Sequence, residues 1–158
     1  MKTGFPKGFT LIEILIVVMI LGLIAAVVIV SINNVSTEAR QTSFITNIRS
    51  FATAAEYYHS NTGEYLADAD AGVVPTGWEE YIEVRKWVKE TPIGGHWDID
   101  DQDTCGFTSC VGVDFDGTGQ IQNDAFMQQV DSKCDDGDLN TGSFRKIADG
   151  QYYYILAM

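Results

Sequence analysis

Ionisable side chains are almost absent from residues 9–32, where Glu13 is the only one. A helix over this range would be about 36 Å long, which is enough to cross the hydrocarbon core of a membrane. The run is longer than the apolar region of a secretory signal and no Ala-x-Ala site closes it, which excludes an ordinary cleaved signal peptide. An unpaired carboxylate at membrane depth costs roughly 2.5 kcal/mol or more. We therefore expect Glu13 to have a partner, for which a charge on a neighbouring copy of the same helix is a candidate.

Residue types that commonly carry catalysis or hold zinc are also scarce. The only histidines, His59 and His96, stand outside any recognisable nucleophile or metal pattern. The three cysteines include no Cys-x-x-Cys pair, which argues against a structural zinc site. The net charge of −12 argues against non-specific binding to nucleic acid. The composition thus predicts a protein that is not an enzyme and has no nucleic-acid partner.

Residues 8–13 read Gly-Phe-Thr-Leu-Ile-Glu and lead directly into the apolar run. This sequence resembles the processing site of the type IV pilin superfamily, which includes type IV pilins and the pseudopilins of type II secretion. The resemblance implies that a prepilin peptidase cuts after Gly8 and methylates the new N-terminus at Phe9. It also implies that Glu13 pairs with the N-terminal amine of a neighbouring subunit in a filament, because two buried opposite charges are tolerable only when paired.

The helical pattern continues beyond the apolar run. Apolar residues recur at spacings of three, four and seven over residues 36–60, which predicts an amphipathic continuation of the helix up to a stop signal at residues 61–63. A short helix is predicted over 78–89, and Asn123 or Asp124 is expected to cap another. The side chains expected to face the core from these helices are Ala39, Ile45, Ile48, Phe51, Ala52, Ala55, Tyr58, Trp78, Tyr81, Ile82, Val88, Phe126, Met127, Val130 and Cys134.

Strand patterns follow Pro92. Residues 97–100 and 111–115 alternate apolar and polar side chains, as half-buried strands do. Residues 144–147 and 152–156 flank a turn signal and predict a hairpin. The economical architecture is α+β, with a long N-terminal helix packed on a small antiparallel sheet, and the same architecture is implied by the resemblance to pilins.

The pattern divides the chain into three segments. Residues 1–8 are expected to be a prepilin leader, and Lys2 and Lys7 favour its retention in the cytoplasm. Residues 9–32 are expected to be the transmembrane and assembly half of the helix. Residues 33–158 then form one periplasmic or extracellular pilin-like domain, because they are too few for two domains.

The three cysteines would lie outside the cytoplasm, where disulfides persist. Cys105 and Cys110 flank an expected turn between two strands, so a bridge there would lock a hairpin. Cys134 is then a buried free thiol that behaves as a small hydrophobe. The alternative pairing joins Cys110 to Cys134 and leaves Cys105 free.

Aspartates are concentrated in residues 98–149, which contain twelve Asp and no Glu. Asp114 and Asp116 open a segment that matches the front half of a calcium loop, although Ala125 replaces the Glu that should end it. Asp136 and Asp138 lie in a second cluster and are the stronger candidates. Asp-Gly pairs are also ordinary turn formers, so the alternatives are plain turns or one calcium ion, which would be the only cofactor.

Two functions of different classes fit the sequence. The first is a structural subunit of a type IV pilus-like filament or a secretion pseudopilus. Its expected partners are copies of itself or related pilins, a prepilin peptidase and inner-membrane assembly machinery, and it would move from the inner membrane to a periplasmic or extracellular filament. The second is a membrane-anchored periplasmic module that binds calcium or another ligand. A plain anchor needs neither Gly8 nor Glu13, whereas a processed and assembled subunit needs both.

Overall fold

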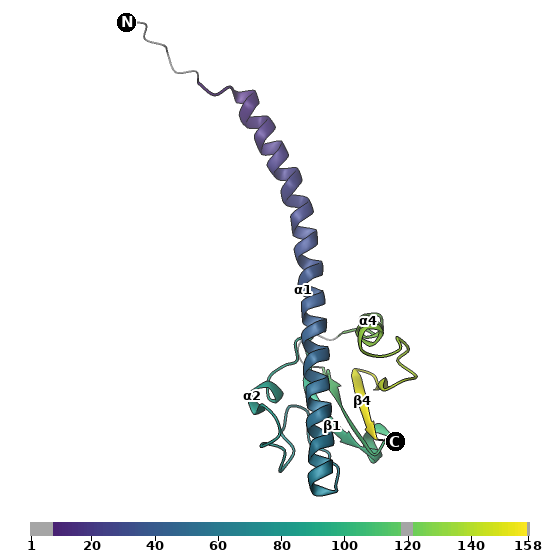
Figure 1. Ribbon diagram of the computed structural model, residues 1–158. Coiled ribbons are helices and arrows are strands. Elements are labelled where there is room, and N and C mark those ends of the chain that lie inside the picture. Colours follow the sequence, from purple (N-terminus) through teal and green to yellow (C-terminus); the bar gives the residue numbers. More distant parts are fainter. Residues whose placement is uncertain (1–7, 118–121, 158) are drawn as a thin grey trace, which may run out of the picture. The chain divides into compact units, whose positions relative to one another are not determined.

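The computed structural model describes residues 8–117 and 122–157, except for the side chains of residues 26–34. The chain divides into two compact units, Met1–Ala39 and Arg40–Met158. The elements confirm the α+β class and the long N-terminal helix followed by a small antiparallel sheet (Figure 1). In chain order they are α1 Leu11–Thr62, α2 Val84–Trp87, β1 His96–Asp101, α3 Gln102–Cys105, β2 Ser109–Asp114, α4 Asp124–Cys134, β3 Phe144–Ala148 and β4 Gln151–Ala157.

The first unit contains the N-terminal part of α1. The predicted membrane-spanning range, residues 9–32, includes residues 26–32, whose side chains lie outside the described part of the chain, as does the leader segment 1–7. Over the residues that are described, no helix has the length and mean hydropathy needed to cross a membrane.

In the second unit, α1 is amphipathic as predicted. Its buried apolar side chains recur at spacings of three and four, which places them on one face of the helix. The expected position Ala39, the last residue of the first unit, is exposed, and the buried face begins at Gln41 in the second unit. The helix ends at Thr62, where Gly63 takes a φ of +78° and donates its N–H to His59 O at 2.8 Å. The buried positions of this face are Gln41, Phe44, Ile45, Ile48, Phe51, Ala52 and Ala55.

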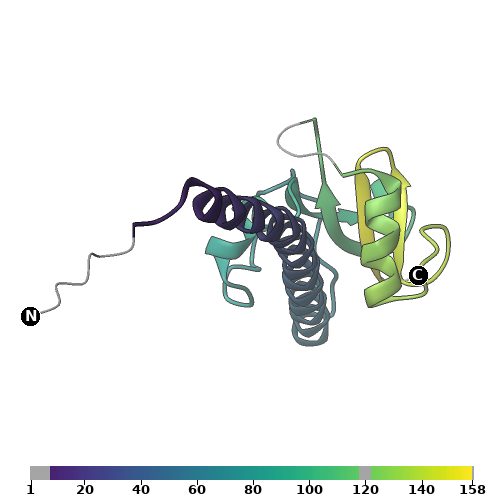
Figure 2. The same cartoon turned by 90° about the horizontal axis from the view of Figure 1, so that it is seen from above.

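The sheet has the strand order β1-β2-β4-β3, and every neighbouring pair is antiparallel. Seen from above in Figure 2, α2 and its loop lie on one side of the part of α1 that belongs to the second unit, and α4 with β3 and β4 lies on the other. The predicted hairpin is present, with Gly150 in its turn at a φ of +82°. Asn123 caps α4 by accepting the Phe126 N–H at 2.9 Å, as one of the two predicted caps.

Aromatic rings form the centre of the core between α1 and the sheet. The Phe51 ring lies 5.0 Å from that of Trp87 and 4.9 Å from that of Trp97, and it also contacts Trp78. All three tryptophans are buried. The Trp87 indole N–H donates to Val73 O at 2.7 Å, so this ring is held at both its apolar and its polar edge.

The helix predicted over residues 78–89 is much shorter than expected. It forms only as α2, because Gly77 has a φ of +86° and turns occupy residues 75–81. Val88, expected to face the core, is exposed, whereas Trp87 is buried. Once most of the segment is turn rather than helix, the 3.6-residue period no longer decides which side chains face inward.

Candidate functional site

Thr10 and Glu13, two residues of the predicted processing motif, cap the N-terminus of α1. The Thr10 backbone N–H and hydroxyl both donate to Glu13 Oε2 at 2.8 Å, and the Glu13 N–H lies 3.3 Å from Thr10 Oγ1. This reciprocal arrangement is a capping box, in which Thr ahead of the helix and Glu three residues later satisfy each other's backbone donors. Glu13 thus has a hydrogen-bonding partner within its own chain, which the charge pattern alone did not indicate.

The junction predicted to be cut lies just ahead of this cap. Gly8 and Phe9 are exposed, and the Phe9 side chain keeps 80% of its surface accessible. A Cβ placed on Gly8 would meet no atom within 4 Å. The junction is therefore open to an approaching enzyme in the described structure of this unit.

The first four turns of α1 present an uncovered apolar surface. Every large apolar side chain from Leu11 to Ile24 is at least 48% exposed, and these side chains surround the helix rather than follow one stripe. A helix that is apolar on all sides is normally buried in a protein core or in a membrane. This surface therefore requires a cover that residues 8–25 do not provide.

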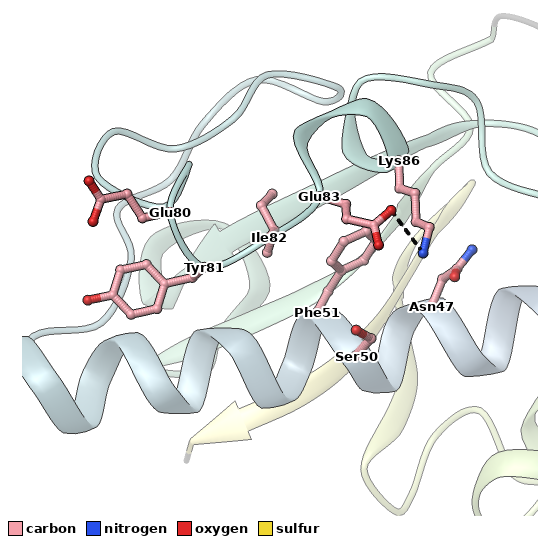
Figure 3. A pocket seen from close by; sticks show the side chains of 8 residues that line it. All are labelled: Asn47, Ser50, Phe51, Glu80, Tyr81, Ile82, Glu83 and Lys86. Carbon is pink, nitrogen blue, oxygen red and sulfur yellow. Dashed lines mark ion pairs between the residues drawn. The ribbon is translucent and has the colours of Figure 1, made fainter.

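A groove of about 300 Å³ lies between α1 and the loop that leads into α2 (Figure 3). Its lining includes Phe51 from α1, and Lys86 and Glu83 form an exposed ion pair of 3.1 Å at its rim. The ionisable side chains of its lining are Glu80, Tyr81, Glu83 and Lys86, and none of the four is buried. This arrangement offers neither a nucleophile held by a base nor a set of metal ligands.

Cys105 and Cys110 are joined in a disulfide, and Cys134 is a free thiol. The bridge joins the last residue of α3, a one-turn helix that the sequence did not predict, to the second residue of β2. Burial, with a smaller contribution from the nearby carboxylate of Asp131, raises the pKa of the Cys134 thiol to about 12. A half-buried thiol with so high a pKa behaves as a small apolar side chain, as predicted.

The four aspartates predicted to bind calcium lie in two separate turns. Asp114 Oδ1 accepts the Asp116 N–H at 2.8 Å, and Asp114 Oδ2 accepts from Gln151 Nε2 at 2.9 Å. Asp136 Oδ1 accepts the Asp138 N–H at 2.9 Å. These side-chain-to-backbone bonds are those of ordinary Asx turns. Residues 118–121 of the first segment lie outside the described part of the chain.

Two further aspartates lie beside Asp136: Asp135, which belongs to the second acidic cluster but was not predicted as a ligand, and Asp131, which the sequence reasoning missed. Single carboxylate oxygens of Asp131, Asp135 and Asp136 lie within 4.8 Å of one another. Burial, together with the charges of Asp136 and Asp135, raises the pKa of Asp131 to about 6. The Gly137 N–H offsets part of this rise without reaching hydrogen-bonding geometry. The sequence could have indicated this pair, because Asp131 and Asp135 are four residues apart at the end of α4, a spacing that brings side chains to the same face of a helix.

Two more carboxyl groups are buried on the face of the sheet opposite α1. Asp98 is 5% exposed and Asp100 is 4% exposed, and both lie on β1. Burial raises the pKa of Asp98 to about 7 and that of Asp100 to about 6. The Tyr153 hydroxyl donates to Asp98 Oδ2 at 2.7 Å. Both disulfide sulfurs lie near the Asp100 carbonyl oxygen, and on this face the bridge packs with Tyr153 and Phe107.

Comparison with known proteins agrees with the site at the N-terminus. The prokaryotic N-terminal methylation motif matches residues 6–29. The fold is similar to that of the major type IV pilin PilA1 from Clostridium difficile, with a TM-score of 0.55 and 18% identity over 79% of this chain and 98% of that chain. A comparison with curated proteins gave no match.

The chain therefore carries a prokaryotic N-terminal methylation motif at the start of a pilin-like fold. The resemblance read from residues 8–13 is thereby confirmed, and so is the pilin-like fold.

Proposed function

We propose that this protein is a non-catalytic structural subunit of a type IV pilus-like or pseudopilus filament. The observation that carries the proposal is the exposed apolar surface from Leu11 to Ile24 beside the single carboxylate of Glu13. This surface is suited to a membrane before assembly and to the same helix of neighbouring subunits after assembly. Both environments remove from water the apolar area that the isolated chain leaves exposed.

Processing is the first step of this proposal. A prepilin peptidase would cut after Gly8 and methylate Phe9, because the junction is exposed and precedes a capped helix. Before processing the chain would sit in the inner membrane with its basic leader in the cytoplasm. After processing, assembly machinery in the inner membrane would move it into a periplasmic or extracellular filament.

Glu13 is the assembly residue in this proposal. The capping box fixes its carboxylate beside the backbone N–H of Thr10, at the start of the helix. A carboxylate held there is pre-oriented toward the end of the chain at which cleavage creates a new positive amine. Pairing with the amine of an adjacent subunit would make the removal of both charges from water tolerable and would set the axial register.

The test is expression of the full chain in a bacterium that has a prepilin peptidase and a filament assembly system. Mass spectrometry of the membrane and filament fractions should find chains that begin at methylated Phe9. Gly8→Val should remain uncut, whereas Gly22→Val, the same change at another glycine with open space around it, should be cut normally. Recovery only of chains that begin at Met1, or that are cut well after Ile32, would overturn the processing step.

The same experiment separates the two functions that fit the sequence. Electron microscopy of sheared material should show filaments that contain the processed chain. A chain that is processed and remains in the membrane as a monomer, with the assembly system active on its own subunits, would contradict the filament role. That result would favour a membrane-anchored module.

A further inference from the structure

Asp131 is a buried carboxyl group without a hydrogen-bonding partner. It lies in the last turn of α4 with an exposed fraction of 0%, and neither Oδ1 nor Oδ2 has a partner. An unsatisfied buried charge is expensive, so such groups are normally paired with a cation or bound to a metal. We therefore expect a cation to neutralise the Asp131 carboxylate, and the described residues do not supply one.

The side chain of Asp131 points toward two other carboxylates. Asp135 and Asp136 are exposed, and one oxygen of each lies within 4.8 Å of the others and of an Asp131 oxygen. The cluster, defined here as Asp131, Asp135 and Asp136, joins one buried anion to two anions that open to solvent. Three like charges at this spacing repel one another unless a cation lies among them.

Backbone donors hold the two exposed carboxylates in place. Asp135 Oδ2 accepts the N–H groups of Ser143 and Phe144, the latter at 3.0 Å. Asp136 Oδ2 accepts the Thr141 hydroxyl at 2.8 Å, and its Oδ1 accepts a backbone N–H. A carboxylate oxygen has two acceptor sites, so these bonds orient both groups and leave acceptor capacity for a further ligand.

The basic side chains around the cluster are engaged elsewhere. Lys133 Nζ donates to Gln41 Oε1 at 2.5 Å, Arg49 donates to Cys134 O at 3.1 Å, and Arg145 Nε donates to Gly142 O at 2.7 Å. Within residues 8–117 and 122–157, none of the ion pairs joins a lysine or arginine to the three aspartates. The Arg145 charge acts on Asp136 from a distance, so it reduces the repulsion within the cluster without satisfying Asp131.

We propose that Asp131, Asp135 and Asp136 bind one divalent cation of the hard, oxygen-preferring class, with calcium as the expected ion. Oxygen-only ligands disfavour zinc and copper, and calcium accepts six to eight oxygens in flexible geometry, which waters and loop carbonyls can complete. The ion would tie the C-terminal turn of α4 to the segment that enters β3. Asp138 and the turn at Asp114 are outside this group of three, so the site differs from either pair that the sequence suggested.

The test uses the full chain in a non-ionic detergent, because the apolar part of α1 needs a cover. Calcium chloride is titrated by calorimetry, and thermal unfolding is followed with calcium, with chelator, and with sodium chloride at equal ionic strength. One calcium per chain and a higher unfolding midpoint in calcium than in matched sodium chloride are expected. Calcium that binds only the folded state would raise its stability by about 2.7 kcal/mol at a hundredfold excess over its Kd.

Two matched variants locate the site. Asp131→Asn should weaken calcium binding at least about tenfold, since loss even of a group that only orients a ligand costs that much. Its unfolding midpoint in chelator should equal or exceed that of the wild type, because the variant removes a buried charge. Asp103→Asn makes the same change at an exposed aspartate outside the cluster and should bind calcium like the wild type. Asp136→Asn, at an exposed position, is the second variant in case Asp131→Asn does not fold.

No binding heat and no calcium-specific shift in the wild type would overturn the proposal. Binding that Asp131→Asn and Asp136→Asn both retain at wild-type strength would also overturn it. Filament assembly is not measured in either experiment, so these outcomes are independent of the proposed function.

Discussion

Tyr153 on β4 reaches across an intervening strand to Asp98 on β1, and its hydroxyl lies 2.7 Å from Asp98 Oδ2. The strand register explains this contact, because Asp98 pairs with Gly112 and Gly112 pairs with Tyr153. Gly112 has no side chain in the row between them. A Cβ there would stand 2.7 Å from both Cα and Cδ1 of Tyr153, so the ring can cross the sheet only above a glycine.

Asp98 makes stability depend on pH. Its pKa is about 7 in the folded protein, against 3.8 for an unperturbed Asp, because burial disfavours the charged form. Between these two values the folded state binds more protons than the unfolded state, so the contribution of Asp98 to stability is full below its unperturbed pKa and is lost as the pH rises through its folded pKa. Asp100, with a pKa raised to about 6 for the same reason, contributes with the same sign.

Asp98→Asn should remove most of this dependence. Asn can accept the Ile99 N–H and donate to the Tyr153 oxygen, so the local bonds are kept while the charge is lost. We expect the variant to be more stable than the wild type at pH 8, by on the order of 1–3 kcal/mol, and close to it at pH 4. Denaturant unfolding at both pH values checks this. Equal gains at both pH values would contradict the titration of Asp98.

Phe51→Ala should strongly destabilise the second unit. The Phe51 ring contacts all three buried tryptophans, so its removal leaves a cavity that the stiff aromatic neighbours cannot fill. The expected loss in unfolding free energy is about 3–5 kcal/mol. Tryptophan fluorescence during denaturant unfolding measures it. Val88→Ala, at an exposed position close in sequence to Trp87, is the control and should cost little; similar losses in both variants would contradict the central role of Phe51.

The disulfide prediction distinguishes the two pairings that the sequence left open. Replacing both Cys105 and Cys110 by Ser should cost about 2 kcal/mol, because the bridge closes a short loop. Reductant should lower the unfolding midpoint of the wild type and of Cys134→Ala alike, and should not affect the double variant. A Cys134→Ala protein that no longer responds to reductant would indicate that Cys134 is in the bridge.

The sequence predicts the helices and the hairpin of the fold better than it predicts which polar side chains are buried. The buried face of α1, the cap of α4 and the final hairpin follow from local rules of period, capping and turn chemistry, and these were predicted correctly. Alternation placed Asp98 and Asp100 on the polar side of a half-buried strand. It could not show that α3, Phe107 and the disulfide cover that side, because this cover comes from segments outside the strand.

The candidate sites also divide into those that a local sequence motif reveals and those that depend on packing between distant segments. Gly8, Phe9 and Glu13 belong to one contiguous motif, which the sequence alone reveals, and their roles in processing and assembly stay predictions. The pair Thr10 and Glu13 also had the spacing of a capping box, although the charge of Glu13 was interpreted first as an intermolecular feature. Asp131 was missed because its burial depends on how α4 packs, which no local pattern of the helix reveals.

Three variants separate the two roles of Glu13, which caps α1 in its own chain and is proposed to pair with the amine of a neighbour. Glu13→Gln keeps an oxygen that can accept from Thr10 and loses only the charge, whereas Thr10→Ala keeps the charge and loses the hydroxyl of the capping box. Glu13→Ala loses both. Each lost cap contact should cost the isolated helix about 0.3–1.5 kcal/mol.

If charge pairing sets the register of assembly, Glu13→Gln and Glu13→Ala should both be cut at Gly8 and inserted but should form few filaments, whereas Thr10→Ala should assemble nearly as well as the wild type. The measurement is the amount of sheared filament relative to the amount of processed chain in the membrane. Each variant is expressed as the sole copy, because wild-type subunits could mask the defect. The opposite ranking, with Glu13→Gln assembling normally and Thr10→Ala failing, would mean that Glu13 acts through the helix cap and that the buried amine finds its counter-charge elsewhere.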